Sequence, residues 1–176
     1  MALNASTLDQ LADLLENCQL QAKDTLKITD THPNMDWDDA YAIQDRILAR
    51  KLARGARVVG YKAGLTSHAK MKQMGVTDPV FGFLVDEFVV PEGAEIKVSD
   101  LIHPKVEPEI CFITRTELKG PGCHIGAVLA ASFLLQVDDT SITKLGSKTS
   151  CCMKWNRAAG RCGSPLAAEP RRRRPE

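Results

Sequence analysis

The first third of the chain has its apolar residues at helical spacing. From Leu8 onward they follow the i, i+3, i+4 rule of an amphipathic helix, with Ser6 as a candidate N-cap. A second helix is predicted from about residue 36 to residue 54, where Gly55 provides a stop. The inward-facing positions expected in the two helices are Leu8, Leu11, Ala12, Leu15, Cys18, Trp37, Ala40, Tyr41, Ile47 and Leu48. The fold is therefore expected to open with two packed helices.

The middle of the chain changes to a strand pattern. Strands are predicted over residues 57–63, 80–85, 95–98 and 105–114. A short helix, capped by Thr66 or Ser67 and ended by Gly75, separates the first two strands. A turn at 120–122 precedes a helix predicted over 124–135. Helices followed by strands indicate an α+β fold.

Two glutamates lie on one face of the last predicted strand, in the run HPKVEPEICF (residues 103–112). Strand side chains alternate between faces, so Glu107 and Glu109 point the same way, with backbones roughly 6–7 Å apart. Converging carboxylates suit a hard cation such as Mg²⁺ or Mn²⁺. The alternative is a half-exposed strand whose acids face water. Pro108 donates no N–H, so this strand is expected at a sheet edge or at a bulge.

Lys62 lies in an apolar, glycine-flanked segment, VVGYKAGL (residues 58–65). Gly60 and Gly64 allow close approach of another backbone. A lysine in such a segment is partly desolvated, which makes it a candidate charge stabiliser or proton donor. The alternative is a lysine at a strand end whose ammonium group reaches water.

Several motifs together resemble a known family. The run VVGYKAGLTSHAKMKQMGVTDPVFGFLVDEF, followed by LIHPKVEPEICF, resembles the 4-oxalocrotonate decarboxylases (2-oxo-3-hexenedioate decarboxylases). These belong with the vinylpyruvate hydratases in the fumarylacetoacetate hydrolase superfamily. The segments ITDTHPNMDWDDAYAIQ and LKGPGCHIGAVLAA are similar to that family as well, so the resemblance covers about residues 1–131. HPK before the two glutamates, and GFLVDEF, favour the decarboxylase branch over the hydratases.

The resemblance implies a fold and a chemistry. The fold is N-terminal helices packed on a mixed, strongly bent β-sheet, a fumarylacetoacetate hydrolase-like β-roll that is incomplete at its C-terminus here. The activity is an Mg²⁺- or Mn²⁺-dependent carboxy-lyase reaction of 2-oxo-3-hexenedioate to 2-oxopent-4-enoate and CO₂, in meta-cleavage degradation of aromatic compounds. Glu107 and Glu109 are then metal ligands, and Lys62 stabilises charge or handles a proton. Thr66 and Ser67 are candidate substrate contacts, although helix capping explains them equally well.

The same resemblance implies partners and leaves two other functions open. The substrate is a small 2-oxo dicarboxylate, and a homo-oligomer, or a hetero-oligomer with the sister hydratase, is expected. One alternative function is hydration of 2-oxopent-4-enoate on the same metal scaffold. The other is an inactive remnant that binds a family partner without catalysis.

Composition favours a cytoplasmic enzyme. A formal net charge of +1 over 176 residues gives no reason to expect nucleic acid or a membrane surface as a partner. No apolar run is long enough to span a bilayer or to act as a signal peptide. The cysteines show no C-x-x-C spacing, so we expect reduced thiols. They are Cys18, Cys111, Cys123, Cys151, Cys152 and Cys162.

The resemblance stops near Ala131, which predicts a boundary. Residues 1–131 form the hydratase/decarboxylase-like domain, with helices over about 6–55 and a β-rich part over about 56–131, while residues 132–176 form a divergent, poorly ordered tail. The family implies a third acidic ligand near position 140, where this chain has Thr140, with Asp138 and Asp139 beside it. We hypothesise a frameshift, a truncation or a divergent end, which finishes in Arg171 to Arg174.

Overall fold

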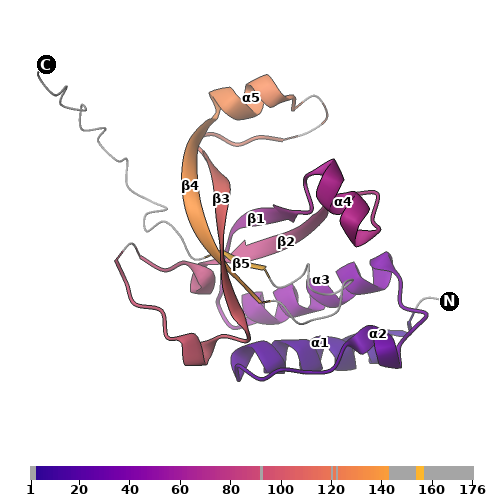
Figure 1. Ribbon diagram of the computed structural model, residues 1–176. Coiled ribbons are helices and arrows are strands. Elements are labelled where there is room, and N and C mark those ends of the chain that lie inside the picture. The colour runs from indigo at the N-terminus through magenta and orange to yellow at the C-terminus, as the bar shows by residue number, and fades with distance from the viewer. Residues whose placement is uncertain (1–2, 92, 120, 122, 143–153, 157–176) are drawn as a thin grey trace, which may run out of the picture.

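A helical layer lies beneath two β-ribbons in the computed structural model of the chain (Figure 1). The structure describes residues 3–91, 93–119, 121, 123–142 and 154–156, and for residues 106–108, 135–142 and 154–156 it describes the backbone alone. Helices α1 (Ala5–Leu20) and α3 (Trp37–Ala53) pack side by side, joined through the short α2 (Ile28–Thr31). The two predicted N-terminal helices are therefore confirmed.

The caps explain where these helices begin. Asn4, and not the predicted Ser6, caps α1, because its side chain accepts a hydrogen bond from the Thr7 N–H at 2.9 Å. At α3, Asp36 and Asp39 form a reciprocal capping box. Gly55 follows the end of α3 with a φ of +97°, a conformation that favours glycine.

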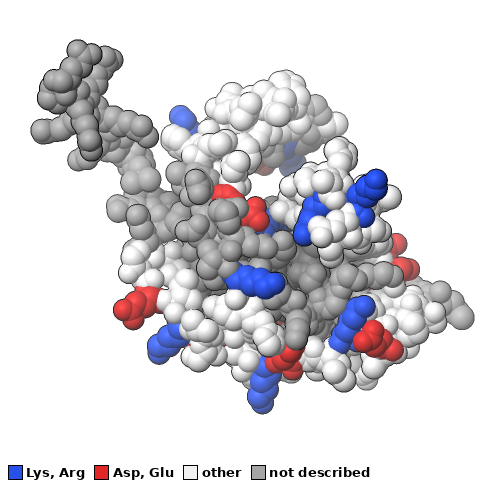
Figure 2. Space-filling model, in the orientation of Figure 1, with Lys and Arg blue, Asp and Glu red and all other residues white. Residues whose placement is uncertain are grey.

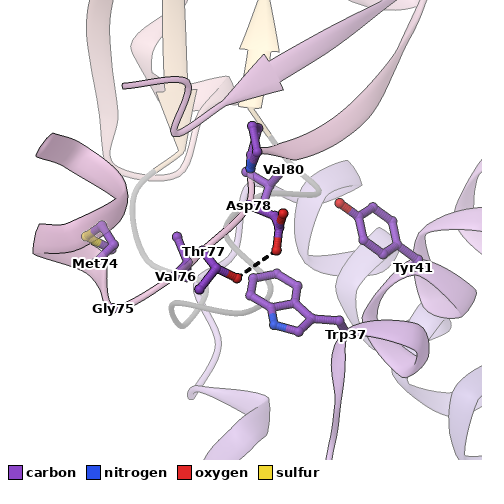
Figure 3. A pocket seen from close by; sticks show the side chains of 9 residues that line it. Trp37, Tyr41, Met74, Gly75, Val76, Thr77, Asp78 and Val80 are labelled. Atoms are coloured by element: carbon purple, nitrogen blue, oxygen red, sulfur yellow. Dashed lines mark hydrogen bonds between the residues drawn. The ribbon is translucent and has the colours of Figure 1, made fainter. Parts of the chain in front are cut away.

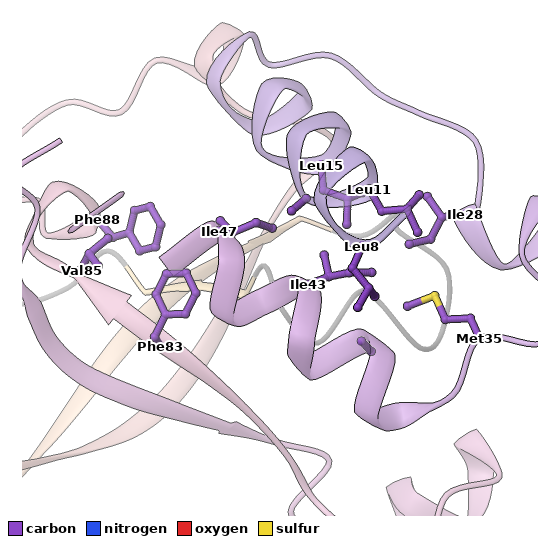
Figure 4. Packing of buried hydrophobic residues seen from close by; sticks show 12 residues of the cluster. Leu8, Leu11, Leu15, Ile28, Met35, Ile43, Ile47, Phe83, Val85 and Phe88 are labelled. Atoms are coloured by element: carbon purple, nitrogen blue, oxygen red, sulfur yellow. The ribbon is translucent and has the colours of Figure 1, made fainter. Parts of the chain in front are cut away.

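The main core lies between the helices and the first ribbon (Figure 4). Leu15 of α1 and Ile43 of α3 are each 1% exposed, and Val85 of the first ribbon is fully buried. The members of the core cluster are Leu8, Leu11, Ala12, Leu15, Ile28, Met35, Ala40, Ile43, Ile47, Phe83, Val85 and Phe88. Burial of their apolar surface is the main force that fixes the first ribbon on the helices.

The first ribbon is a two-stranded antiparallel sheet. Strand β1 (Val58–Gly64) pairs with β2 (Val80–Val85), and helix α4 (His68–Met74) lies between them in the chain. The 3₁₀ turn η1 (Asp86–Phe88) follows β2. Lys51 of α3, only 1% exposed, pairs with Glu87 of this turn at 3.3 Å and lies 5.0 Å from the centre of the Phe88 ring. The helical layer is thus tied to the end of the ribbon.

The second ribbon is a three-stranded antiparallel sheet in the order β3–β4–β5. Its strands are β3 (Pro104–Thr114), β4 (Ser132–Ile142) and β5 (Lys154–Asn156), with α5 (Ile125–Ala130) between the first two. Within the described residues β3 is an edge strand, as Pro108 predicted.

Three details of the sequence prediction are wrong or unconfirmed. No strand forms over 95–98; instead a 3₁₀ turn, η2, spans Val98–Asp100. The helix predicted over 124–135 ends at Ala130, because the chain turns there and enters β4. The α+β class is confirmed, but the described strands form two small antiparallel sheets, and a mixed, bent β-roll is not confirmed by them.

Charged residues of both signs are interspersed on the face shown in Figure 2, without a large patch of one sign among the described residues. Among the helices that the structure describes, none has the length and apolar character needed to cross a membrane.

Candidate functional site

Lys62 and Glu109 meet between the two ribbons. The Lys62 Nζ lies 2.8 Å from the Glu109 Oε1, with the lysine side chain 9% exposed and the glutamate side chain 34% exposed. The predicted partial desolvation of the Lys62 side chain is therefore confirmed. The Coulombic attraction within a pair of such limited access to solvent is stronger than on the surface, because fewer water molecules screen it.

Glycines make room for the buried lysine. In β1, Gly60 and Gly64 lie two residues on either side of Lys62, so they share its face of the strand. Gly82 of β2 lies directly opposite Lys62 in the antiparallel register. The long lysine side chain thus has no bulky neighbour at these three positions. The sequence showed two of these glycines beside Lys62, but Gly82 could be assigned only from the strand register.

The side chains of β3 alternate as the sequence predicts. Glu109 and Cys111 are half-buried, whereas Ile110 is 65% exposed and Phe112 is 47% exposed. Burial raises the pKa of the Cys111 thiol, and the positive charge of nearby Lys62 acts in the opposite direction. Glu109 and Cys111 therefore face the lysine, and the Glu109 carboxylate is not simply presented to water.

The second predicted ligand, Glu107, lies two residues before Glu109 on the same strand. The backbone register places Glu107 opposite Asp139 of β4 and places Glu109 opposite Val137. Residues directly opposite in an antiparallel pair belong to the same face of the sheet. Among the residues whose side chains are described, no group of three or more His, Cys, Asp or Glu is arranged to hold a metal ion.

Thr66 and Ser67 follow β1 at the start of α4. Leu65, with a left-handed φ of +57°, turns the chain out of the strand. The Ser67 side chain accepts a hydrogen bond from the Lys70 N–H at 3.2 Å, so Ser67 caps α4. Thr66 is exposed. The capping role is thus confirmed for Ser67, and substrate contact by either residue stays a prediction.

His103 anchors the beginning of β3. Its Nε2 lies 2.9 Å from the Asp24 Oδ2, in the loop that follows α1, and its backbone has a φ of +45°. Left-handed backbone at a residue other than glycine is uncommon and persists where tertiary contacts hold it. His103 therefore helps to set where β3 starts, although its partner could not be predicted from the sequence.

A separate pocket of about 460 Å³ lies between α3 and the loop that enters β2 (Figure 3). The Tyr41 hydroxyl accepts a hydrogen bond from the Phe81 N–H at 3.2 Å, and the Thr77 hydroxyl donates to Asp78 at 2.7 Å. The lining residues are Trp37, Tyr41, Met74, Gly75, Val76, Thr77, Asp78, Pro79 and Val80. Neither Lys62 nor Glu109 lines this pocket.

Comparison with known proteins identifies the relatives of the chain. It is 56% identical over 122 residues to the 4-oxalocrotonate decarboxylase of Pseudomonas sp. (strain CF600), a match that covers 69% of this chain and 46% of that protein. It is 53% identical over 129 residues to the Pseudomonas putida enzyme of the same name, covering 73% of this chain and 49% of that protein. The chain is a relative of the 4-oxalocrotonate decarboxylases over about 70% of its length.

Other comparisons give the same relationship. A 2-hydroxypent-2,4-dienoate hydratase of Pseudomonas putida is 37% identical over 131 residues, covering 74% of this chain and 59% of the hydratase. The solved 4-oxalocrotonate decarboxylase from Pseudomonas putida G7, complexed with magnesium and adipate, superposes with a TM-score of 0.80 at 39% identity and covers 90% of this chain and 64% of that one. No family model matches. The resemblance found in the sequence is confirmed, and the chain spans about half the length of the curated relatives it matches.

Proposed function

We propose that this chain derives from, or is part of, an enzyme that decarboxylates 2-oxo-3-hexenedioate (4-oxalocrotonate) to 2-oxopent-4-enoate and CO₂, in meta-cleavage degradation of aromatic compounds. The observation that carries this is the buried Lys62 beside Glu109, because it brings together two residues that the family resemblance assigns to one site. The higher identity to the decarboxylases than to the hydratase supports the same choice.

Glu107 and Glu109 are proposed as ligands of Mg²⁺ or Mn²⁺. The Glu109 carboxylate lies against a positively charged group, the Lys62 ammonium, and this contact supports a cation at this position. Carboxylate oxygens are the ligands that hard divalent ions prefer. The neighbouring solved decarboxylase is complexed with magnesium in one structure and with calcium in another. Carboxylate donors at Glu107 and Glu109 would therefore suit a divalent ion.

Asp139 is the best-placed candidate for a third acid, because the register places it opposite Glu107. Asp138 lies one position away and belongs to the other face of the strand. Thr140, at the expected family position, carries no negative charge. A site with fewer carboxylates binds Mg²⁺ less tightly and fills its coordination sphere with water.

Decarboxylation requires stabilisation of the negative charge that develops on the substrate. The C5–C6 bond of the substrate breaks, CO₂ leaves, and the electron pair moves through the C3–C4 double bond onto the C2 oxygen. A divalent ion, when bound, polarises the C2 carbonyl group as a Lewis acid. Lys62, with its positive charge held in a poorly hydrated place, stabilises the developing charge on the same oxygen and supplies or holds a proton. Thr66 and Ser67 are proposed to hydrogen-bond the substrate carboxylates.

The β-roll of the family is proposed as the complete fold. An apolar face of the second ribbon supports it, since Phe112 lies opposite Leu134 in the register and the two are 47% and 56% exposed. In the β-roll, further strands would cover that face. We also propose residues 1–131 as the family domain and residues 132–176 as a divergent tail.

Exposed apolar surface also supports a proposal of oligomeric partners. A homo-oligomer, or a hetero-oligomer with the sister hydratase, would cover exposed apolar surface of this chain. Mixing the purified protein with such a hydratase and following both by size-exclusion chromatography with light scattering tests the second form. Separate elution at unchanged masses would contradict it.

The test of the reaction is to incubate the purified chain with Mg²⁺ and each of two substrates. We expect slow, Mg²⁺-dependent CO₂ release from 2-oxo-3-hexenedioate, because the family position of the third acidic ligand is occupied by the uncharged Thr140. Hydration of 2-oxopent-4-enoate without CO₂ release would favour the hydratase instead. A folded protein that turns over neither substrate would favour the inactive remnant. Turnover at the rate of an intact relative would mean that the site is complete, and Asp139→Asn would then identify its third acid.

A further inference from the structure

The Lys62 ammonium lies where a metal bound to Glu109 would compete with it. The two side chains are 2.8 Å apart. A divalent ion held by the same carboxylate would bring a second positive charge close to the ammonium group. Two positive charges close together in a poorly hydrated site repel each other strongly. Metal binding to Glu109 would therefore weaken the Lys62–Glu109 ion pair.

We infer that Lys62 is a built-in counter-ion that holds Glu109 before metal binding and must release it when the metal binds. The inference rests on the proposed metal site and adds a sequence of events to it. In the metal-free protein the pair compensates two charges that have little access to water: the lysine is 9% exposed and the glutamate is 34% exposed. Without a partner, each charge would carry an uncompensated desolvation cost.

Three glycines flank Lys62 on its face of the first ribbon. Gly60, Gly64 and Gly82 carry no side chains, so none of them blocks a change in the lysine rotamer. In the proposed exchange, the displaced ammonium group then meets the negative charge of the substrate. Metal binding would then both load the carboxylates and release the lysine for catalysis, which predicts that metal binds before substrate.

The decisive measurement is the affinity of the chain for Mg²⁺ without substrate, by isothermal titration calorimetry. Lys62→Met keeps the length of the side chain but removes its charge. We expect this variant to bind Mg²⁺ about tenfold more tightly than the parent, since the metal no longer displaces an ion-pair partner. Lys62→Arg, which keeps the charge, is expected to bind no more tightly than the parent. A purely structural role of Lys62 would not raise metal affinity.

Lys70→Met is the matched control, because Lys70 is an exposed lysine on α4 and its substitution changes the net charge by the same amount. It should leave Mg²⁺ affinity unchanged, and an equal gain in both variants would overturn the inference by reducing it to net charge. Equal affinity of the parent and Lys62→Met would also overturn it, while leaving the metal site intact. No Mg²⁺ binding by either folded protein would instead refute the metal site itself.

Should Lys62→Met fail to fold, Lys62→Gln takes its place, since its amide still donates a hydrogen bond to Glu109. Its Mg²⁺ affinity is expected to exceed that of the parent, and an affinity equal to or below the parent value would overturn the inference.

Discussion

Lys62 of β1 and Glu109 of β3 form the ion pair that connects the two ribbons at the candidate site, with Nζ and Oε1 2.8 Å apart. The core packs mainly on the first ribbon and the helices, so this pair is one of the contacts that place β3 relative to β1. A change at either residue therefore affects both the site and the packing of the ribbons.

Glu109→Gln should lower the stability of the metal-free protein. The substitution leaves the Lys62 ammonium with a neutral partner in a poorly hydrated place, and we expect a loss of about 1–2 kcal/mol, moderated by the partial exposure of Glu109. Urea unfolding followed by circular dichroism measures it. Glu95→Gln, at an exposed acid, is the control and should change stability little. The same loss in both variants would argue against a specific role for the pair.

The ligand assignment is tested by metal binding of the same variant. Glu109→Gln and Glu107→Gln should each weaken Mg²⁺ binding, because each removes one of the proposed carboxylate ligands. Calorimetry and the Mg²⁺-induced rise in Tm both report the effect. If the double variant binds Mg²⁺ as well as the parent does, neither glutamate is a ligand.

Gly82→Val should disturb the site, because it would place a branched side chain directly opposite Lys62 in the register. We expect a loss of the Lys62–Glu109 contact and weaker coupling of the ribbons, seen as a lower Tm and faster amide exchange in β3. Gly60→Ala, at a glycine on the same face of β1, is the milder comparison, because the nearest atom to an added Cβ there is the Leu84 Cδ1 at 3.8 Å, an ordinary contact. Comparable damage from both substitutions would contradict the specific role of Gly82.

Cys111 should react slowly with iodoacetamide at neutral pH. Burial raises the pKa of its thiol, so less of the reactive thiolate is present, while the Lys62 charge counteracts this in part. Peptide mass spectrometry should find Cys111 modified more slowly than the exposed Cys123. In Lys62→Met the rate at Cys111 should fall further and the rate at Cys123 should not change. A faster reaction at Cys111 in that variant would show that access, and not charge, limits its reactivity.

Asp86 should make the folding stability depend on pH in the acid range. Hydrogen bonds from the Arg57 backbone N–H and then from its side chain hold the pKa of Asp86 below its usual value. The resulting stabilisation is present above the usual carboxyl pKa of about 4 and is lost as the pH falls through the lower folded-state value. Asp86→Asn should therefore lower Tm near neutral pH, and the difference from the parent should shrink in acid. Asp45→Asn, at an exposed acid on α3, should show no such pH-dependent difference.

The spacing of apolar and polar residues in the sequence determined the individual helices and strands. The apolar spacing of α1 and α3 predicted both helices, and the bounds of β2 were predicted as the structure has them. The alternation along β3 placed Glu109 and Cys111 on the same face, and Pro108 predicted an edge strand. These features follow from side-chain periodicity and backbone chemistry, which a sequence records directly.

Only the tertiary structure decided which residues lie opposite one another across the strands and between the ribbons. The sequence marked Lys62 and two glutamates as candidates, but only the packing of the ribbons made Glu109 a 2.8 Å partner of the lysine. Only the register set Gly82 opposite Lys62 and Asp139 opposite Glu107. The end of α5 at Ala130 likewise reflects the pairing of β4 with β3, which outweighs the helical pattern that continues past it. Such contacts join residues far apart in the chain, and their free energy depends on how whole elements pack, which local periodicity does not contain.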